Sequence, residues 1–282
     1  MPNLDTVIFP VAGLGTRMLP ATKVLPKELL PVYDTPLLQF AIDEALAAGA
    51  RRLIFVSHPE KAAICNYLRP KRSLERTLAV QGKQSALDAV RATVPADDVE
   101  IVFTMQDAPL GLGHAVLCAA DYALPGPVGV VLPDDLILGT PCLPEMVTAF
   151  DPTRMGALVA AQKVPLQQVS SYGIFECDET SASMTIPARS FVEKPEISDT
   201  PSTLAAVGRY ILTHEVFDAL RTTVPGAGGE IQLTDAIAAR GGIHAFRFSG
   251  VRYDCGDKDG IVDATLAVQH ARRSGHLRVA AE

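Results

Sequence analysis

The chain has 282 residues, 48% of them hydrophobic, and a formal net charge of −7 at pH 7. This size and apolar content are enough to bury a large core, and the acidic balance argues against broad nucleic-acid binding. No apolar run reaches membrane-spanning length and the N-terminus lacks the pattern of a signal peptide, so we expect a cytoplasmic protein without a membrane partner.

A glycine turn follows the first predicted strand, Val7–Phe9. Gly13 and Gly15 allow backbone N–H groups to approach phosphate oxygens. Arg17 adds a rigid fork of donors, and Lys27 adds a point charge that suits phosphoryl chemistry. The segment lacks the third glycine of a dinucleotide fingerprint and the lysine–serine pair of a Walker A loop. It predicts a phosphate-binding loop of another kind, and the alternative is a plain turn with solvated cations.

The rest of the chain alternates between predicted strands and helices. The strands are Arg52–Val56, Glu100–Thr104, Val128–Leu132, Gly156–Val164, Arg189–Val192 and Leu204–Leu212, and the helices are Leu37–Ala48, Glu60–Leu68, Ser85–Ala92, Gly113–Tyr122 and Ile261–Arg273. Such alternation favours an α/β fold, a Rossmann-like mixed and mostly parallel sheet flanked by helices. We expect a single domain over 1–282, in which 241–282 forms a C-terminal strand and a covering or interface helix.

Several polar residues stand where ligands collect in such folds, at the ends of strands. Asp134 and Asp254 each follow an apolar, strand-like run and carry the hard oxygens that suit Mg²⁺, although aspartates also cap helices and begin turns. Gln106 can offer a donor and an acceptor to a pyrimidine edge. We expect His114, alone at a helix start, to pack or cap rather than to catalyse. The five cysteines are widely spaced without a CxxC motif, which indicates neither a disulfide framework nor a zinc site.

The segment AGLGTRMLPATKVLPKELLPV at 12–32 resembles the signature of sugar-nucleotide pyrophosphorylases. Matching segments follow in the family's order: Gln106 with GLGHAV at 111–116, LPDDLI at 132–137, YGIF at 172–175, FVEKP at 191–195, AVGRYIL at 206–212, GEIQLTDAI at 229–237 and YDCGDK at 253–258. GLGHAV and GEIQLTDAI are most similar to the uridylyl-transferring group. The resemblance therefore implies attack of glucose 1-phosphate on the α-phosphorus of UTP, which releases pyrophosphate and needs no general base.

The same resemblance assigns roles to individual residues. It implies catalytic cations at Arg17 and Lys27, nucleotide contacts at Ala12, Gly13, Gly15, Gln106 and Gly111, sugar-phosphate contacts at Gly173, Glu193, Lys194, Gly208 and Glu230, and Mg²⁺ on Asp134 and Asp254, with Asp135 as the alternative ligand. Glu230 suits an early-turn helix acid equally well. The family also implies a homo-oligomer, a dimer or tetramer.

Three alternative functions remain open from the residues. A thymidylyltransferase would share this architecture, and the stretch 107–110 departs from the composition of the uridylyl group. A non-catalytic nucleotide-sugar sensor would be expected to have lost Lys27, Asp134 or Asp254, and all three are present. A Rossmann dehydrogenase is the weakest alternative because the glycine motif does not match.

Overall fold

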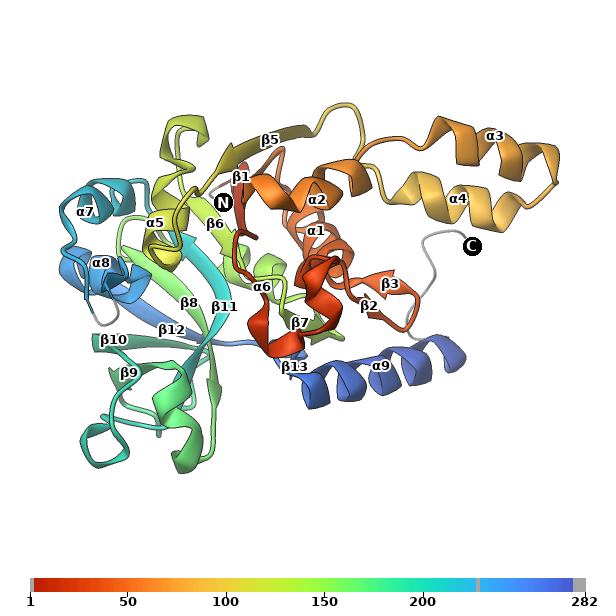
Figure 1. Cartoon of the computed structure of the whole chain (residues 1–282). Coiled ribbons are helices and arrows are strands. Elements are labelled where there is room, and N and C mark those ends of the chain that lie inside the picture. The colour runs from red at the N-terminus through yellow and green to blue at the C-terminus, as the bar shows by residue number, and fades with distance from the viewer. Residues whose placement is uncertain (1–2, 227–228, 276–282) are drawn as a thin grey trace.

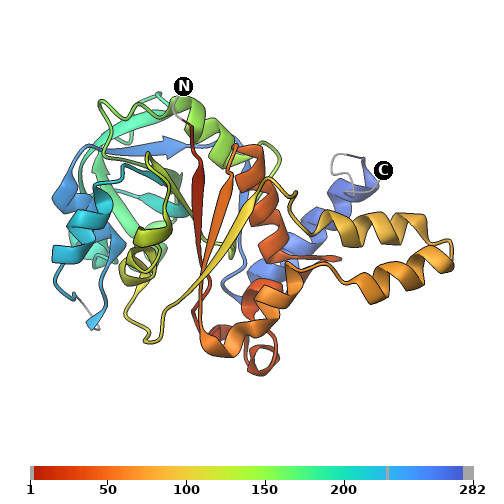
Figure 2. The ribbon, with the colours of Figure 1, turned by 90° about the horizontal axis from the view of Figure 1, so that it is seen from above.

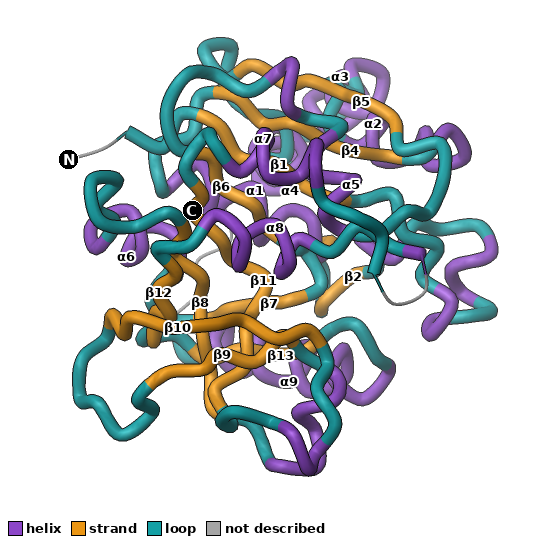
Figure 3. The backbone as a smooth tube through the Cα atoms, turned by 90° about the vertical axis from the view of Figure 1, so that its left-hand side faces the viewer, coloured by secondary structure: helices purple, strands orange, loops and turns teal. Residues whose placement is uncertain are grey.

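The structure, a computed structural model, describes residues 3–226 and 229–275 (Figure 1). Its centre is a nine-stranded sheet with the order β5-β4-β1-β6-β11-β8-β12-β10-β9. The strands of this sheet are β1 (Thr6–Pro10), β4 (Arg52–Ser57), β5 (Glu100–Met105), β6 (Val128–Val131), β8 (Ala157–Lys163), β9 (Gly173–Cys177), β10 (Thr185–Glu193), β11 (Leu204–Leu212) and β12 (Ile243–Arg247). β4 and β5 lie at one end of the sheet, and β9 and β10 lie at the other (Figure 3).

Helices cover both faces of the sheet. The α-helices are α1 (Leu37–Ala47), α2 (Ala62–Tyr67), α3 (Arg72–Val80), α4 (Gln84–Ala92), α5 (Leu112–Leu117), α6 (Cys142–Ala149), α7 (Val216–Thr222), α8 (Leu233–Arg240) and α9 (Lys258–Arg273). One core cluster joins α1, α2 and α6 to the sheet, and a second cluster joins α5, α7 and α8 to its opposite face. Alternating side chains feed the two clusters, as in β1, where Val7 and Phe9 enter the first and Ile8 enters the second.

The sheet is mixed, and the expectation of a mostly parallel sheet is not confirmed. β1, β4, β5 and β6 pair in parallel, as the βαβ pattern predicts, and β8 pairs in parallel with β12. The pairs of β11 with β6 and β8, and of β10 with β9 and β12, are antiparallel. The link between β9 and β10 is too short for the crossover of a dozen or more residues that parallel strands need.

Two small ribbons lie beside the main sheet. β2 (Pro31–Val32) pairs with β3 (Thr35–Pro36), and β7 (Asp135–Leu138) pairs with β13 (Val251–Asp254), all antiparallel. Helix α9 packs on β2 and β13 through the buried Ala264 and Val268. It begins at Lys258, three residues before the expected start, and is capped by Asp257, whose side chain accepts a hydrogen bond from the Gly260 N–H.

A helical hairpin made by α3 and α4 projects from the body of the molecule (Figure 2). The predicted bounds of α4 differ from the observed bounds by one residue. α3 was not expected, and none of its residues is buried. Within residues 3–226 and 229–275, no helix combines the length and apolar character needed to span a membrane.

Candidate active site

The loop after β1 folds back on Lys27. Gly15 has φ 65°, in the left-handed region that favours glycine, and its carbonyl accepts a 2.8 Å hydrogen bond from Thr22 Oγ1. A Cβ built on Gly15 would stand 3.1 Å from Lys27 Cβ and 3.2 Å from Thr22 Cγ2. The loop contains three short 3₁₀ turns, of which the first carries the exposed Arg17 and the third begins at Lys27.

Lys27 forms an ion pair with Asp134, the residue that the sequence predicts as the principal metal ligand. The Nζ to Oδ2 distance is 2.5 Å. Burial alone would lower the pKa of Lys27, but the charge of Asp134 and its hydrogen bond outweigh this, so the pKa is raised. Burial likewise would raise the pKa of Asp134, and the charge and hydrogen bond of Lys27 outweigh it, so that pKa is lowered. Both groups are therefore held in their charged forms at neutral pH.

Asp254 lies directly beside this pair, across the β7–β13 ribbon. It is paired in register with Asp135, and the N–H of the next residue, Cys255, donates a 2.8 Å hydrogen bond to the Asp134 carbonyl. The Arg252 guanidinium lies between the acids, 2.5 Å from Asp135 Oδ1 and 2.9 Å from Asp254 Oδ2. Burial raises the pKa of Asp135, and the charges of Asp134 and Asp254 add to that effect while Arg252 opposes it.

The donor set around Gly256 fits a divalent cation. A Cβ on Gly256 would stand 2.9 Å from Asp254 Oδ1 and 3.8 Å from both Asp134 Oδ2 and Arg17 Nη1. The glycine thus leaves a small space flanked by two carboxylates and a guanidinium, where Mg²⁺ and phosphate oxygens have suitable partners. The part of the chain that the structure describes holds no cluster of three or more acidic, histidine or cysteine side chains that would enclose a metal by itself. A cation here would rely on its substrate for further ligands.

Gln106 is buried directly after β5 and contacts Gly111 and His114. Its Nε2 donates a 3.0 Å hydrogen bond to the Gly111 carbonyl and lies 3.1 Å from His114 Nδ1. Gly111 has φ 92°, and a Cβ there would stand 2.8 Å from Glu230 Cβ. The geometry thus places His114 beside Gln106 and requires a glycine at 111.

A hollow between the sheet and α8 gathers all five residues that the resemblance assigns to the sugar phosphate. Gly173, Glu193, Lys194, Gly208 and Glu230 line it. Asp135, Tyr172, Tyr210 and Thr234 are among the other residues of its wall. Asp135 also contacts Arg252, and Glu230 lies close to Gly111. The hollow therefore borders both the acidic residues of the β7–β13 ribbon and the Gln106 segment.

Backbone irregularities shape this hollow. The pairing of β11 with β8 shifts register between Ala206 and Tyr210, and Gly208 lies in that irregularity, where its N–H donates a 2.6 Å hydrogen bond to Asp135 Oδ2. Lys194 has φ 45°, an uncommon conformation for a non-glycine residue, and its Nζ lies 3.3 Å from Glu193 Oε1. Such strain tends to gather at functional sites.

Sequence reasoning missed several polar residues of the site. Arg252 joins Asp135 to Asp254, and Tyr172 donates a 3.1 Å hydrogen bond to Asp254 Oδ2. Thr234 lies in the wall of the hollow, and its hydroxyl has no partner among the residues described. One signal was available: Arg252 and Asp254 are two apart in a strand, so they share a face.

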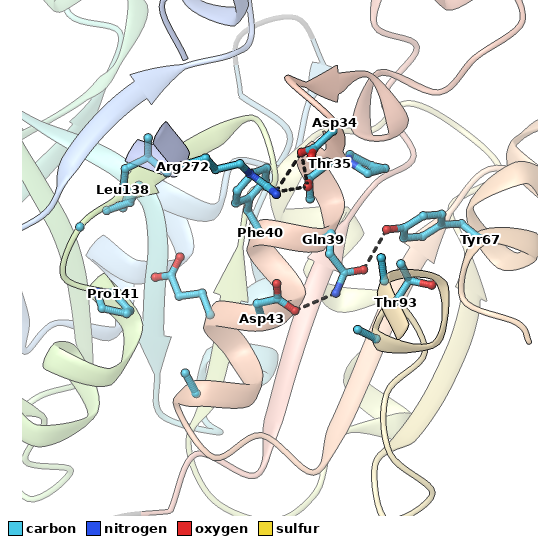
Figure 4. Close-up of a pocket in the computed structure, with 17 residues that line it drawn as sticks. Asp34, Thr35, Gln39, Phe40, Asp43, Tyr67, Thr93, Leu138, Pro141 and Arg272 are labelled. Carbon is cyan, nitrogen blue, oxygen red and sulfur yellow. Dashed lines mark hydrogen bonds and ion pairs between the residues drawn. The ribbon is translucent and has the colours of Figure 1, made fainter. Parts of the chain in front are cut away.

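A second hollow lies away from these residues, between α1, α4, β7 and α9 (Figure 4). Several of its polar groups pair with one another: Tyr67 donates to Gln39, Gln39 donates to Asp43, and Arg272 lies 2.9 Å from Asp34. Arg272 Nε and Nη1 are buried and have no hydrogen-bond partner among the residues described. None of the residues predicted for the site lines this hollow. The chemistry therefore points to the hollow beside α8.

Comparisons with known proteins bear on the family of this chain. The family described as nucleotidyl transferase matches residues 7–270. A UTP–glucose-1-phosphate uridylyltransferase of Haemophilus ducreyi is 43% identical over 269 residues, which span 92% of this chain and 90% of that protein. A UDP-glucose pyrophosphorylase solved with UDP-glucose has a TM-score of 0.84 at 34% identity and covers 95% of this chain and 99% of its own. A UTP-bound enzyme of the same type from Acinetobacter baumannii has a TM-score of 0.85 at 36% identity, covering 94% of this chain and 93% of its own.

Proposed function

The chain belongs to the nucleotidyl transferase family, in the group of bacterial UTP–glucose-1-phosphate uridylyltransferases, and from this membership we propose how its site transfers a uridylyl group. The reaction joins UTP and glucose 1-phosphate into UDP-glucose and releases pyrophosphate. The observation that carries the proposal is the continuity of the site. Contacts run from Gly111 through Glu230 and the hollow to Asp135, and then through Arg252 to Asp254 and Gly256.

The uracil lies, in this proposal, beside Ala12, Gly13, Gln106 and Gly111. The buried Gln106 amide offers its acceptor oxygen to the ring, while its Nε2 is held by the Gly111 carbonyl. The left-handed conformation of Gly111 keeps the backbone free of a side chain at this point. Gly15 and Arg17 bind the triphosphate, and Arg17 acts on the departing pyrophosphate.

Glucose 1-phosphate occupies the hollow beside α8. Gly173, Gly208, Glu193 and Glu230 contact the hexose, because their backbone and carboxylate groups line the wall where sugar hydroxyls would lie. Lys194 neutralises the sugar phosphate. This arrangement fixes one phosphate oxygen in line with the α-phosphorus, so that alignment replaces a general base.

The charge that develops during transfer is met by cations already in place. Lys27 is held in its charged form by Asp134, so it requires no proton transfer before it acts. Mg²⁺ held by Asp134 and Asp254 would neutralise phosphate charge and draw the reacting groups together. Asp135 is less suited to hold the metal than Asp254, because the Asp135 side chain is 11% exposed and that of Asp254 is 38% exposed.

The remaining expectations belong to the same proposal. We propose that 1–282 acts as one domain in the cytoplasm and that the enzyme assembles as a dimer or tetramer. Helix α9 offers a surface for such contact, because Val262 and Leu266 are exposed on it four residues apart. Light scattering of the purified protein would test the assembly.

The first experiment is pyrophosphate release from purified protein with Mg²⁺, comparing UTP with dTTP. A reaction without sugar and an Asp134→Ala variant serve as controls. We expect release that depends on glucose 1-phosphate, favours UTP and is lost in the variant. Preference for dTTP would make the protein a thymidylyltransferase instead. Silence with both nucleotides would contradict the proposal and favour a binding protein or another sugar.

A further inference from the structure

Lys61 joins the two ends of the phosphate-binding loop. Its Nζ donates a 2.7 Å hydrogen bond to the carbonyl of Val11, where the loop begins. The same atom lies 3.0 Å from Glu28 Oε1 and 2.9 Å from Glu28 Oε2, where the loop ends. Glu28 is the neighbour of Lys27 in the chain, so this contact closes the segment that carries the glycine turn and the proposed catalytic cation.

The Lys61–Glu28 pair is buried, and the Lys61 ammonium group has an acceptor for each of its three donors. Lys61 is 9% exposed and Glu28 is 1% exposed. An ammonium group has three donors, and here three oxygen atoms accept from it. Burial raises the pKa of Glu28 and lowers the pKa of Lys61, while the attraction between their charges opposes both shifts.

Lys61 itself is fixed to the central sheet. It ends the 3₁₀ turn Pro59–Lys61, which follows β4, and its N–H donates a 2.9 Å hydrogen bond to the His58 carbonyl. The Val11 N–H bonds in turn to the Val56 carbonyl of β4 at 2.9 Å. Both ends of the loop are therefore anchored at β4. Val11 bonds to this strand directly, and Glu28 is held through Lys61 in the turn that follows the strand.

Stability alone is a weak reason for such a pair. Well-packed apolar side chains of similar volume often stabilise a core as well as a buried ion pair does. A charged pair has a directional requirement that apolar packing lacks, since it is satisfied only in one arrangement of its partners. At this place that arrangement sets where Lys27 stands relative to Gly13 and Gly15.

We propose that Lys61, together with Glu28, is a positioning residue that sets the distance between the glycine turn and the Lys27 ammonium group. It acts on the phosphates that leave as pyrophosphate, through the loop rather than by contact. The inference rests on the proposed function, because it assumes that the loop holds the triphosphate. It predicts that loosening the pair harms pyrophosphate binding and turnover more than it harms binding of UDP-glucose, because UDP-glucose is also held outside the loop, by Gln106, Gly111 and the hollow beside α8.

The test compares Lys61→Met and Glu28→Gln with the wild-type enzyme in the direction that consumes pyrophosphate and UDP-glucose. We expect kcat/KM for pyrophosphate to fall on the order of a hundredfold, because small misplacements of catalytic groups cost that much. The Kd for UDP-glucose, measured by calorimetry without pyrophosphate, should stay within about threefold of the wild-type value. Ile64→Ala is the matched control, since Ile64 is buried on the adjacent helix α2 and forms no part of the pair.

Three results would overturn the proposal. The first is an unchanged kcat/KM for pyrophosphate in folded Lys61→Met protein. The second is an equal loss of pyrophosphate use and UDP-glucose binding, and the third is the same profile in Ile64→Ala; either of these would indicate general destabilisation. If a single variant fails to fold, the double variant Glu28→Gln/Lys61→Met, which leaves no unpaired buried charge, takes its place with the same expectations. A wild-type protein without uridylyl transfer would refute the proposed function instead, so the two failures are distinguishable.

Discussion

Replacement of Lys27 by alanine tests the centre of the proposed mechanism. The lost ammonium group lies 2.5 Å from Asp134 Oδ2, and its side chain is 26% exposed. A partly solvated ion pair of this kind contributes on the order of 1 kcal/mol to folding. A preorganised cation beside developing charge contributes more to the transition state, about 3 kcal/mol, which corresponds to roughly a hundredfold in rate. We therefore expect kcat to fall about a hundredfold while the free energy of unfolding changes little.

The assay is steady-state pyrophosphate release with both substrates varied, together with urea unfolding of the same preparations. Lys71→Ala is the control, because Lys71 is exposed at the start of α3 in the projecting hairpin. It removes one positive charge without touching the site and should leave both measurements unchanged. An unchanged kcat with a raised KM in Lys27→Ala would show that Lys27 binds substrate and transition state equally. That result would refute the catalytic role.

Substitutions at three further positions test the surroundings. Arg252→Met leaves the buried Asp135 and the partly exposed Asp254 without their shared cation. It should lower the free energy of unfolding by about 3 to 5 kcal/mol in urea, mainly through Asp135, with Arg252→Lys losing less; a Met variant as stable as wild type would contradict this. Gly208→Ala puts a Cβ 2.5 Å from Leu132 Cβ, so we expect a loss of about 1 to 3 kcal/mol and a raised KM for glucose 1-phosphate, and unchanged values would show that the site can relax. Burial raises the pKa of Cys255 from 9.0 to about 12. Above pH 9 the unfolded chain therefore releases a proton that the folded chain keeps, and the free energy of unfolding should fall by about 1.4 kcal/mol per pH unit up to about pH 12. Cys255→Ala should lack this component in urea unfolding across that range, and parallel pH curves for the two proteins would refute it.

The local sequence pattern was sufficient to predict an element where the element is long and has a single hydrophobic periodicity. The parallel strands β1, β4 and β5 and the helix α1 lie within one or two residues of the expected bounds, because buried strands carry β-branched runs and α1 carries a helical repeat. α3 was not predicted, although Leu74 and Leu78 stand four residues apart in it, as in an amphipathic helix. It packs on α4 and buries none of its residues. The local pattern also did not predict the pairing direction of β9, β10 and β11, because this direction depends on the path by which the chain returns to the sheet and not on composition.

The sequence by itself determined the family of this protein, through the matching segments. The glycine turn, Arg17, Lys27 and the acids at strand ends predict a phosphate-binding site, because that prediction depends on residue type and near-neighbour spacing. Only the tertiary structure decided which of these groups meet. Lys27 pairs with a residue 107 positions away, and Arg252 reaches an acid 117 positions away. Ion pairs between residues so far apart in the chain depend on the order of the strands in the sheet and on the connections between them. They therefore cannot be predicted from a local sequence pattern.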